Sequence, residues 1–456
     1  MDEDTDQTVP PPYPGGSTSI PLPSLPGMGG LVSVDFIPGC IKEGGMFSLA
    51  EYEPFSAVLR RANEWLGSCP TLQLKSCETV EFLAAHSGAL FNYVESDYLT
   101  GSHSHSVRAL RLWLQPRTDG SSVTQQIGYF NIIPAANLFN INTGLLATVR
   151  QVTAERLDTL IEQTNTMLVR EPVPGRIVTI ETVVLQVKPD GGIDSDSTSW
   201  FGVGNARDTF VCMLRVYYEA GPPQYETIGV ADFVPAVLME GVGLLGPPLL
   251  EPYPQVLAKT HHWLMNQSDI RVTNIQTMLH KQKLTAHLDT LRMAYTEDML
   301  SYYVRYLRVA FVKVNPHAVP GSGILRPVNL NSKLFAPALL QPPKCCVNMV
   351  GVFESQLQVR ERMAYWVRAT GARVISVETF PMRFVTGQES REGFDTMHTS
   401  NLVIIRNGIA SKAIERYLIL YRVYLDGVYP DPPGYTETGI DVATYRQYQA
   451  DACTIL

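Results

Sequence analysis

The chain has 456 residues, more than one ordinary hydrophobic core needs, so we expect two to four domains. Hydrophobic residues make up 45% of the chain and charged residues only 18%, a balance typical of a folded protein rather than a disordered one. The formal net charge of −8 and the lack of any basic cluster argue against a nucleic-acid-binding surface.

Residues 1–30 have the composition of a disordered, proline-rich arm. The arm starts with acidic residues and has neither the basic start nor the apolar core of a signal peptide. The most apolar long region, 229–252, is interrupted by acidic residues and prolines, so it is not expected to span a bilayer. Seven cysteines without CxxC spacing favour reduced thiols over disulfides or zinc. We therefore expect a cytoplasmic protein with neither a metal site nor a cofactor.

A strand–helix–strand–strand pattern recurs four times between residues 31 and 426. In the first copy, 31–116, strand-like segments at 31–38, 71–82 and 107–114 surround a helical segment at 52–66 whose apolar residues follow helical spacing. The remaining copies span 127–220, 228–315 and 345–426. The predicted fold class is therefore α+β, built from four internal repeats.

One such repeat would leave a sheet face and two sheet edges uncovered, so we expect the repeats to pack in pairs as two domains, 31–220 and 221–426. The opening strand of the fourth repeat is predicted at 346–353, after a Pro/Gly-rich insert at 316–344 that serves as a linker or functional loop. Pro38, Pro134 and Pro235 end the first three opening strands, and the fourth has no such proline. Residues 427–456 form a C-terminal tail.

Each repeat places a glutamate or glutamine in its middle strand and one arginine in its closing strand. Glutamine cannot replace glutamate in proton transfer, and a general acid is not expected in every copy, so a structural role is favoured over catalysis. We predict that each acidic or amide side chain pairs across the strands with the arginine of its own repeat. The predicted pairs are Glu78 with Arg111, Glu181 with Arg215, Gln276 with Arg308 and Glu378 with Arg422. The chain also lacks GxSxG, P-loop, HExxH and dinucleotide-binding motifs, so no catalytic residues are predicted.

The last four residues, CTIL, have the form of a prenylation box with Cys453 as the modified thiol, and the final leucine favours a geranylgeranyl group. The preceding residues 441–452 lack the polybasic stretch that often strengthens such an anchor. Membrane association through this group alone would therefore be reversible.

The sequence PPPY at 10–13 matches the PPxY ligand of WW domains, with Pro10, Pro11 and Tyr13 as the recognised residues. PPQY at 222–225 and PPGY at 432–435 also match. These two stretches directly follow predicted strands, so we interpret them mainly as turns.

Three functions fit these patterns. The first is a non-catalytic cytoplasmic adaptor, held near membranes by a prenyl group and recruiting a WW-domain protein. The second is a binding protein for a lipophilic small molecule, with a pocket between paired repeats lined by aromatic residues such as Trp113, Tyr217 and Tyr218. The third is a viral matrix or capsid component, suggested by the low charge content and the PPxY motif.

Overall fold

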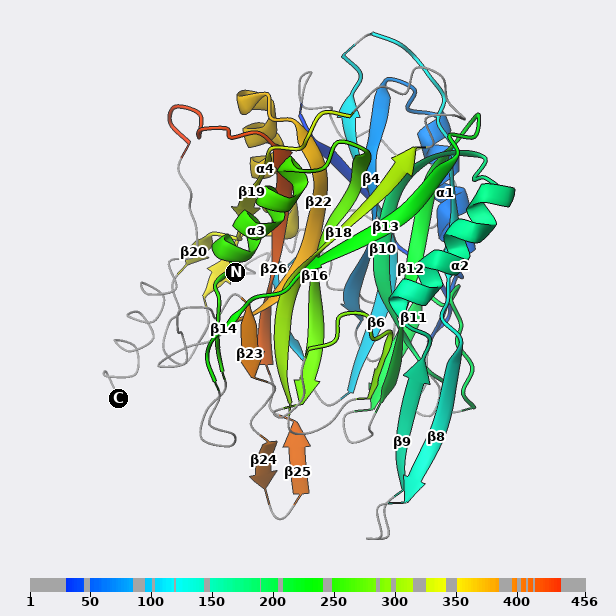
Figure 1. The fold of residues 1–456 in the computed structure, drawn as a ribbon. Coiled ribbons are helices and arrows are strands. Elements are labelled where there is room, and N and C mark those ends of the chain that lie inside the picture. The colour runs from blue at the N-terminus through cyan, green and yellow to red at the C-terminus, as the bar shows by residue number, and fades with distance from the viewer. Residues whose placement is uncertain are drawn as a thin grey trace, which may run out of the picture.

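We analysed a computed structural model of the chain. The structure describes residues 30–44, 50–84, 95–100, 103–118, 120–142, 148–188, 190–203, 208–240, 248–283, 288–296, 301–314, 325–341, 351–384, 396–399, 403–406, 409–412 and 415–435. The fold is mixed and rich in strands. Within the described residues, four helices and four four-stranded sheets are arranged like the blades of a four-bladed propeller (Figure 1).

Four consecutive segments of the chain, which we call units 1 to 4, follow the same order of elements. Each has an opening strand, two short strands that pair with each other, a helix, a long inner strand, a short strand and a long closing strand. Unit 1 contains β1 (Val32–Phe36), β2 (Cys40–Lys42), β3 (Glu51–Tyr52), α1 (Phe55–Gly67), β4 (Leu72–Ala84), β5 (Asp97–Thr100) and β6 (His103–Pro116). Unit 2 contains β7 (Ile127–Ile132), β8 (Ala136–Asn142), β9 (Thr148–Ala154), α2 (Leu157–Arg170), β10 (Gly175–Gln186), β11 (Ser199–Val203) and β12 (Thr209–Ala220).

Units 3 and 4 keep this order, and unit 4 adds one further pair of short strands. Unit 3 contains β13 (Glu226–Phe233), β14 (Val237–Met239), β15 (Leu249–Leu250), α3 (Tyr253–Met265), β16 (Ile270–Lys283), β17 (Ala294–Thr296) and β18 (Ser301–Val314). Unit 4 contains β19 (Leu330–Phe335), β20 (Leu339–Gln341), β21 (Val352–Phe353), α4 (Gln356–Thr370), β22 (Val374–Phe384), β23 (Met397–Thr399), β24 (Val403–Arg406), β25 (Ile409–Lys412) and β26 (Glu415–Asp426).

The closing strand is the centre of each sheet. In unit 1, the inner strand β4 pairs with one edge of β6, and the opening strand β1 pairs with residues 110–114 on the other edge. The rest of that second edge, residues 103–107, is taken by β11 of unit 2. All of these pairings are antiparallel, so β6 is bonded on both sides along most of its length.

The short strand of each unit is donated to the sheet of the neighbouring unit. β11 pairs with β6, β17 with β12, β23 with β18 and β5 with β26. The last of these pairings joins unit 1 to unit 4 and closes the ring. The sequence predicts only loops at these positions, because strands of three to five residues are too short to show a periodic pattern.

The helices cover the outside of the ring, with α1 and α2 on one side of the view in Figure 1 and α3 and α4 on the other. Apolar spacing explains which face of each helix is buried: in α1 the buried residues are Phe55, Val58, Leu59, Ala62 and Leu66. Helix α4 begins with a capping box between Ser355 and Gln358 and ends at Gly371, whose φ of 63° is the left-handed conformation that favours glycine.

The four largest hydrophobic clusters each draw residues from two neighbouring units. Ile127 and Val178 of unit 2 pack into the cluster around α1, and Leu330 and Tyr424 of unit 4 pack into the cluster around α3. The same sharing joins units 2 and 3, and units 4 and 1. Sharing therefore occurs both inside the predicted domain pairs and between them, and the division at residues 220–221 stays a prediction.

The opening strand of unit 4 is not at 346–353, where the sequence pattern predicted it. It is β19, which lies inside the predicted insert 316–344 and pairs with β26. Residues 352–353 form β21, which pairs with β20 as the equivalent short strands of the other units do. With this correction Pro337 follows β19 at the same distance as Pro38, Pro134 and Pro235 follow their strands. The apolar run at 346–353 was the misleading signal.

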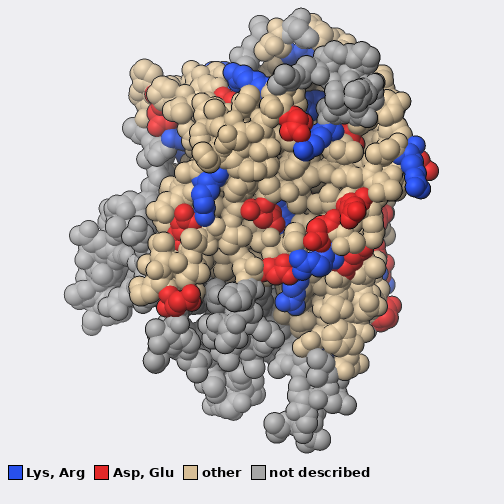
Figure 2. All heavy atoms as spheres, in the orientation of Figure 1, with Lys and Arg blue, Asp and Glu red and all other residues tan. Residues whose placement is uncertain are grey.

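Among the described residues, no helix is both long and apolar enough to cross a membrane. Acidic and basic side chains are dispersed over the face shown in Figure 2, between broad uncharged areas.

Candidate functional site

The inner strands β4, β10, β16 and β22 surround the centre of the ring, each in contact with the next. Each pairs with its own closing strand on one side only, so its other edge would carry unpaired backbone N–H and C=O groups. Buried groups of this kind need hydrogen-bond partners, which here come from side chains of the adjacent inner strand.

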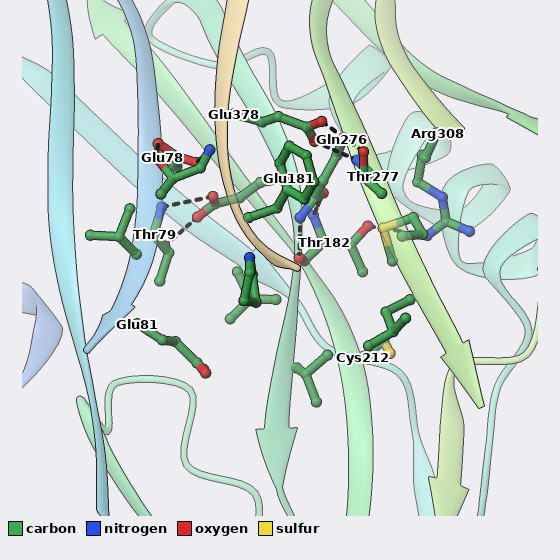
Figure 3. A pocket seen from close by; sticks show the side chains of 18 of the residues that line it. Glu78, Thr79, Glu81, Glu181, Thr182, Cys212, Gln276, Thr277, Arg308 and Glu378 are labelled. Carbon is green, nitrogen blue, oxygen red and sulfur yellow. Dashed lines mark hydrogen bonds between the residues drawn. The ribbon is translucent and has the colours of Figure 1, made fainter. Parts of the chain in front are cut away.

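A glutamate or glutamine on each inner strand binds a threonine of the preceding unit. The backbone N–H of Thr79 donates to the Glu181 carboxylate at 2.9 Å, and the Thr79 hydroxyl donates to the same carboxylate. Glu378 accepts the same two bonds from Thr277, both at 2.6 Å, and Glu78 accepts them from Thr379. In Figure 3 the side chains of Thr79 and Glu181, and those of Thr277 and Glu378, point toward each other.

The arginine of each closing strand donates to the same threonine hydroxyls. Arg111 bonds Thr379 at 2.8 Å, Arg215 bonds Thr79 at 3.2 Å, Arg308 bonds Thr182 at 3.1 Å and Arg422 bonds Thr277 at 2.9 Å. In three of the four cases the hydroxyl accepts from arginine and donates to glutamate, which uses its donor and one acceptor position. We call each of the four sets of a glutamate or glutamine, a threonine and an arginine a node.

Unit 3 differs from the others in two linked positions. Gln276 accepts from the Thr182 N–H at 2.9 Å and donates to the Thr182 carbonyl at 3.0 Å. In the other units an aromatic residue two positions after the arginine donates to the glutamate: Trp113 to Glu78, Tyr217 to Glu181 and Tyr424 to Glu378. Ala310 occupies this position in unit 3. Because glutamine brings its own donor, the third donor is not needed there.

The predicted Glu–Arg pairs are opposite each other in strand register in all four units. Only Arg422 and Glu378 make a direct ion pair, at 2.9 Å. Arg111 instead pairs with Asp35, and Arg308 pairs with Asp232, each through two hydrogen bonds from guanidinium to carboxylate. Arg215 donates to Asn131 at 3.0 Å. The prediction therefore needs correction for Glu78, Glu181 and Gln276, because these side chains bond the neighbouring unit and not the arginine of their own repeat.

The nodes are buried, and burial shifts the acid–base properties of their groups. Burial raises the pKa of Glu78 to about 7, although Arg111 and the bonds from Thr379 act in the opposite direction. Burial also raises the pKa of Glu181. Burial alone would raise the pKa of Asp35 too, but Arg111 and Arg360 outweigh it and lower that pKa to about 2.

A cavity of about 410 Å³ extends along the axis from the ring of nodes. All eight glutamate, glutamine and threonine residues of the nodes line it. Of the four strand positions three residues after each glutamate or glutamine, Glu81, Leu279 and Pro381 are exposed and Val184 is half-buried. We take the nodes as the floor of the cavity and these exposed residues as its mouth. Figure 3 shows Glu81 and Cys212 farther along the strands from the floor.

The cavity wall combines aromatic, aliphatic and charged side chains. Tyr98, Trp200 and Tyr295 reach it from three of the donated strands, β5, β11 and β17. Phe210 lies against Tyr295 with ring centroids 5.2 Å apart and against Trp200 at 5.8 Å. An aromatic wall therefore runs across the boundary between two sheets.

The aromatic residues predicted to line a pocket do not line this cavity. Trp113 and Tyr217 are fully buried, and their N–H and O–H groups are used in the nodes. Tyr218 lies over Gly128, where an added Cβ would meet its ring at 2.2 Å. The expectation does not hold for this cavity, because the side chains of Trp113 and Tyr217 are buried between the strands, where they bond the glutamates.

Of the short motifs, PPGY at 432–435 is described and forms a turn, with the Tyr435 N–H bonded to the Pro432 carbonyl at 3.0 Å. Its tyrosine is half-buried and accepts a bond from Arg362. In PPQY, Tyr225 has a φ of 51°, which is incompatible with an extended proline-type helix. Pro10, Pro11, Tyr13 and Cys453 lie outside the described residues.

Two groups of site residues were missed from the sequence. A threonine directly follows the glutamate or glutamine in every unit: Thr79, Thr182, Thr277 and Thr379. The sequence therefore shows the recurring Glu-Thr or Gln-Thr dipeptide, but it does not show which residues this dipeptide bonds. Asp35 and Asp232 occupy equivalent places in their opening strands, but Asn131 and Leu334 replace them elsewhere and hide the pattern.

In the described part of the chain, no group of three or more His, Cys, Asp or Glu residues could hold a metal ion.

Replacing Thr79 by valine should lower the free energy of unfolding by about 1–3 kcal/mol, because it removes the hydroxyl between the buried Arg215 and Glu181. Thr182→Val is the matched control. Gln276 binds the backbone of Thr182 rather than its hydroxyl, so only the bond from Arg308 is lost and the effect should be smaller. Urea unfolding of both variants tests this, and equal losses would contradict the bridging role.

Two buried groups should give opposite pH dependences. The folded pKa of Glu78, about 7, exceeds its ordinary 4.5, so its contribution to stability is full below pH 4.5 and is lost as pH rises toward 7. Burial and the nearby Arg292 lower the pKa of His280 to about 4 from 6.5, so its contribution is full above pH 6.5 and is lost as pH falls toward 4. In the wild type the two slopes oppose each other between pH 4.5 and 6.5.

Glu78→Gln, which copies the residue found in unit 3, should therefore make stability fall more steeply toward low pH. His280→Gln should have the reverse effect. The expected difference between pH 4.5 and pH 7 is on the order of 1–3 kcal/mol for each variant, measured by urea unfolding at a series of pH values. Parallel pH profiles of the wild type and both variants would show that these groups do not titrate as their burial implies.

Comparisons with family models, with curated proteins and with solved structures find no significant match for this chain.

Proposed function

We propose that the protein is a non-catalytic binding protein that holds a small amphipathic molecule in its axial cavity. The observation that carries the proposal is the cavity of about 410 Å³ at the meeting point of all four sheets. This volume falls in the range of about 300–1,000 Å³ that is usual for small-molecule sites. Cavities of this kind combine apolar walls with a few polar groups that orient the ligand.

The floor of the cavity supports binding more than catalysis. The carboxylates of Glu78, Glu181 and Glu378 already accept hydrogen bonds from neighbouring threonines, and Arg111 and Arg308 are held by Asp35 and Asp232. Groups that are occupied in this way hold the shape of the site and are poorly placed to exchange protons with a substrate. A preformed, rigid site also lowers the entropic cost of binding.

The four units are, in the same proposal, copies of one strand–helix–strand–strand module. What supports this is the equivalent placing of the glutamate or glutamine, the threonine and the arginine in every unit. A module whose inner strand needs side chains from its neighbour has no stable end, so closing the ring with four copies satisfies every edge.

The adaptor role stays a second proposal, and it rests on the sequence alone. PPPY at 10–13 would recruit a WW-domain protein, and Cys453 would carry a geranylgeranyl group that brings the cavity to a membrane surface reversibly. A self-assembling structural role is the remaining alternative. It is favoured by exposed apolar residues on β14, namely Val237, Leu238 and Met239.

Cavity binding is tested by narrowing the mouth. Leu279 lines the cavity and is 47% exposed, so Leu279→Trp should fold normally and weaken binding of a lipophilic fluorescent probe at least tenfold. Leu340→Trp is the matched control, because Leu340 is similarly exposed on β20 but does not line the cavity. Probe fluorescence gives the affinities. Equal binding by the wild type and both variants would place the probe elsewhere and count against the proposal.

The adaptor proposal is tested by the intact mass of the protein made in eukaryotic cells. Prenylation should remove the last three residues and add one geranylgeranyl group, and Cys453→Ser should abolish both changes. An unmodified wild-type C-terminus would remove membrane association from the proposal. The recruitment of a WW-domain protein is tested by titrating a peptide of residues 1–20 with WW domains, and the same peptide with Tyr13→Ala is the control.

A further inference from the structure

The charged residues around the axial cavity differ in how fully their charges are already compensated. Arg108 donates to Glu81 at 3.0 Å and to the Val184 carbonyl at 2.5 Å. Arg111 and Arg308 are each held by two bonds to an aspartate. These three guanidinium groups are buried and have protein partners, so they are poorly placed to bind a ligand's charge.

Arg292 is different. It lines the cavity and is exposed, and within the described part of the chain its guanidinium makes no ion pair. The nearest acidic candidate along the chain, Asp289, is engaged elsewhere: its carboxylate pairs with Arg156 at 2.8 Å and accepts from the Leu291 N–H. The positive charge of Arg292 is therefore available at the mouth.

His280 lies in the field of Arg292 and also lines the cavity. Its pKa of about 4 leaves it neutral at pH 7, so it adds no second charge there. Asp289 and Asp232 raise that pKa, whereas burial, Arg292 and Arg308 lower it and prevail. A neutral imidazole can donate one hydrogen bond to an anionic group held by Arg292.

The rest of the wall is apolar and partly aromatic. Val183, Cys212 and Met293 are buried on the side of the cavity formed with unit 2, next to the Phe210 and Tyr295 stack. Flat rings pack well against such a wall, since aromatic pairs favour offset or edge-to-face contact. The charge of Arg292 and the apolar wall together favour a ligand that is apolar along its body and negatively charged at one end.

We infer that the cavity, if it binds a small molecule as proposed above, selects amphiphiles that carry a flat apolar body and one anionic group. Arg292 binds the anion at the mouth, and the aromatic wall receives the apolar body. The inference rests on the proposed function and narrows it to one class of ligand. Carboxylate and sulfonate share the required chemistry, because both present oxygens to a guanidinium.

Two fluorescent probes with a common skeleton test this selectivity. 1-Anilinonaphthalene-8-sulfonate carries one negative charge, and N-phenyl-1-naphthylamine is its neutral counterpart. The wild type should bind the sulfonate at least tenfold more tightly at low salt, which corresponds to about 1.4 kcal/mol. Arg292→Gln should remove that preference and leave the affinity for the neutral probe unchanged. Arg373→Gln, at an exposed arginine outside the cavity, should change neither affinity.

The outcomes distinguish failure of the anionic selectivity from failure of cavity binding itself. If both probes bind equally, are weakened by Leu279→Trp and ignore Arg292→Gln, the cavity binds ligands but the anionic class is wrong. If neither probe binds, or if binding ignores Leu279→Trp, the proposed function itself fails. Circular dichroism of each variant confirms folding, and Arg292→Gln is expected to fold because its side chain is exposed.

Discussion

The structure depends on providing hydrogen-bond partners for the backbone groups along the unpaired edges of the four inner strands at the centre of the molecule. Each edge is buried, and each is closed by a glutamate or glutamine from the next unit that binds a threonine backbone N–H. An unpaired buried polar group costs about 1–3 kcal/mol, so the ring is stable only when all four contacts form together. The last contact joins Glu78 of the first unit to Thr379 of the fourth, and it makes the two ends of the chain interdependent.

Burying Glu181, Glu378 and four arginines close to the half-buried Glu78 is costly unless each charge has partners. The threonine hydroxyl meets this need by accepting from arginine and donating to glutamate. Where unit 3 has Gln276 and Ala310, the charge and its aromatic donor are absent together, which keeps the count of donors and acceptors balanced. In unit 4 the charge of the arginine is compensated differently. Leu334 replaces the aspartate of the opening strand, and Arg422 pairs directly with Glu378 and packs over Tyr253.

The cavity follows from the same arrangement. Beyond the nodes the inner strands continue for several residues, and some of these residues line the cavity. These positions differ between units: Leu279 and His280 line the cavity from β16, whereas Phe380 and Pro381 line it from β22. A nearly symmetric frame thus carries an asymmetric lining, in which Arg292 supplies a charge that the described protein groups leave uncompensated. Recognition can vary here without disturbing the frame, because the floor is fixed by the nodes.

The sequence alone determined the helices, eleven of the twelve predicted long strands, and the register that puts each glutamate or glutamine opposite its arginine. The strand that it misplaced is the opening strand of unit 4. These features are local or follow from periodic spacing. It could not show that the glutamate or glutamine of every unit bonds a threonine of the neighbouring unit, that strands as short as β17 pair with the sheet of the preceding unit, or that β19 lies in an apparent insert. Those outcomes depend on contacts between residues about 100 or more positions apart, as with Thr79 and Glu181, and only closure of the ring brings such residues together.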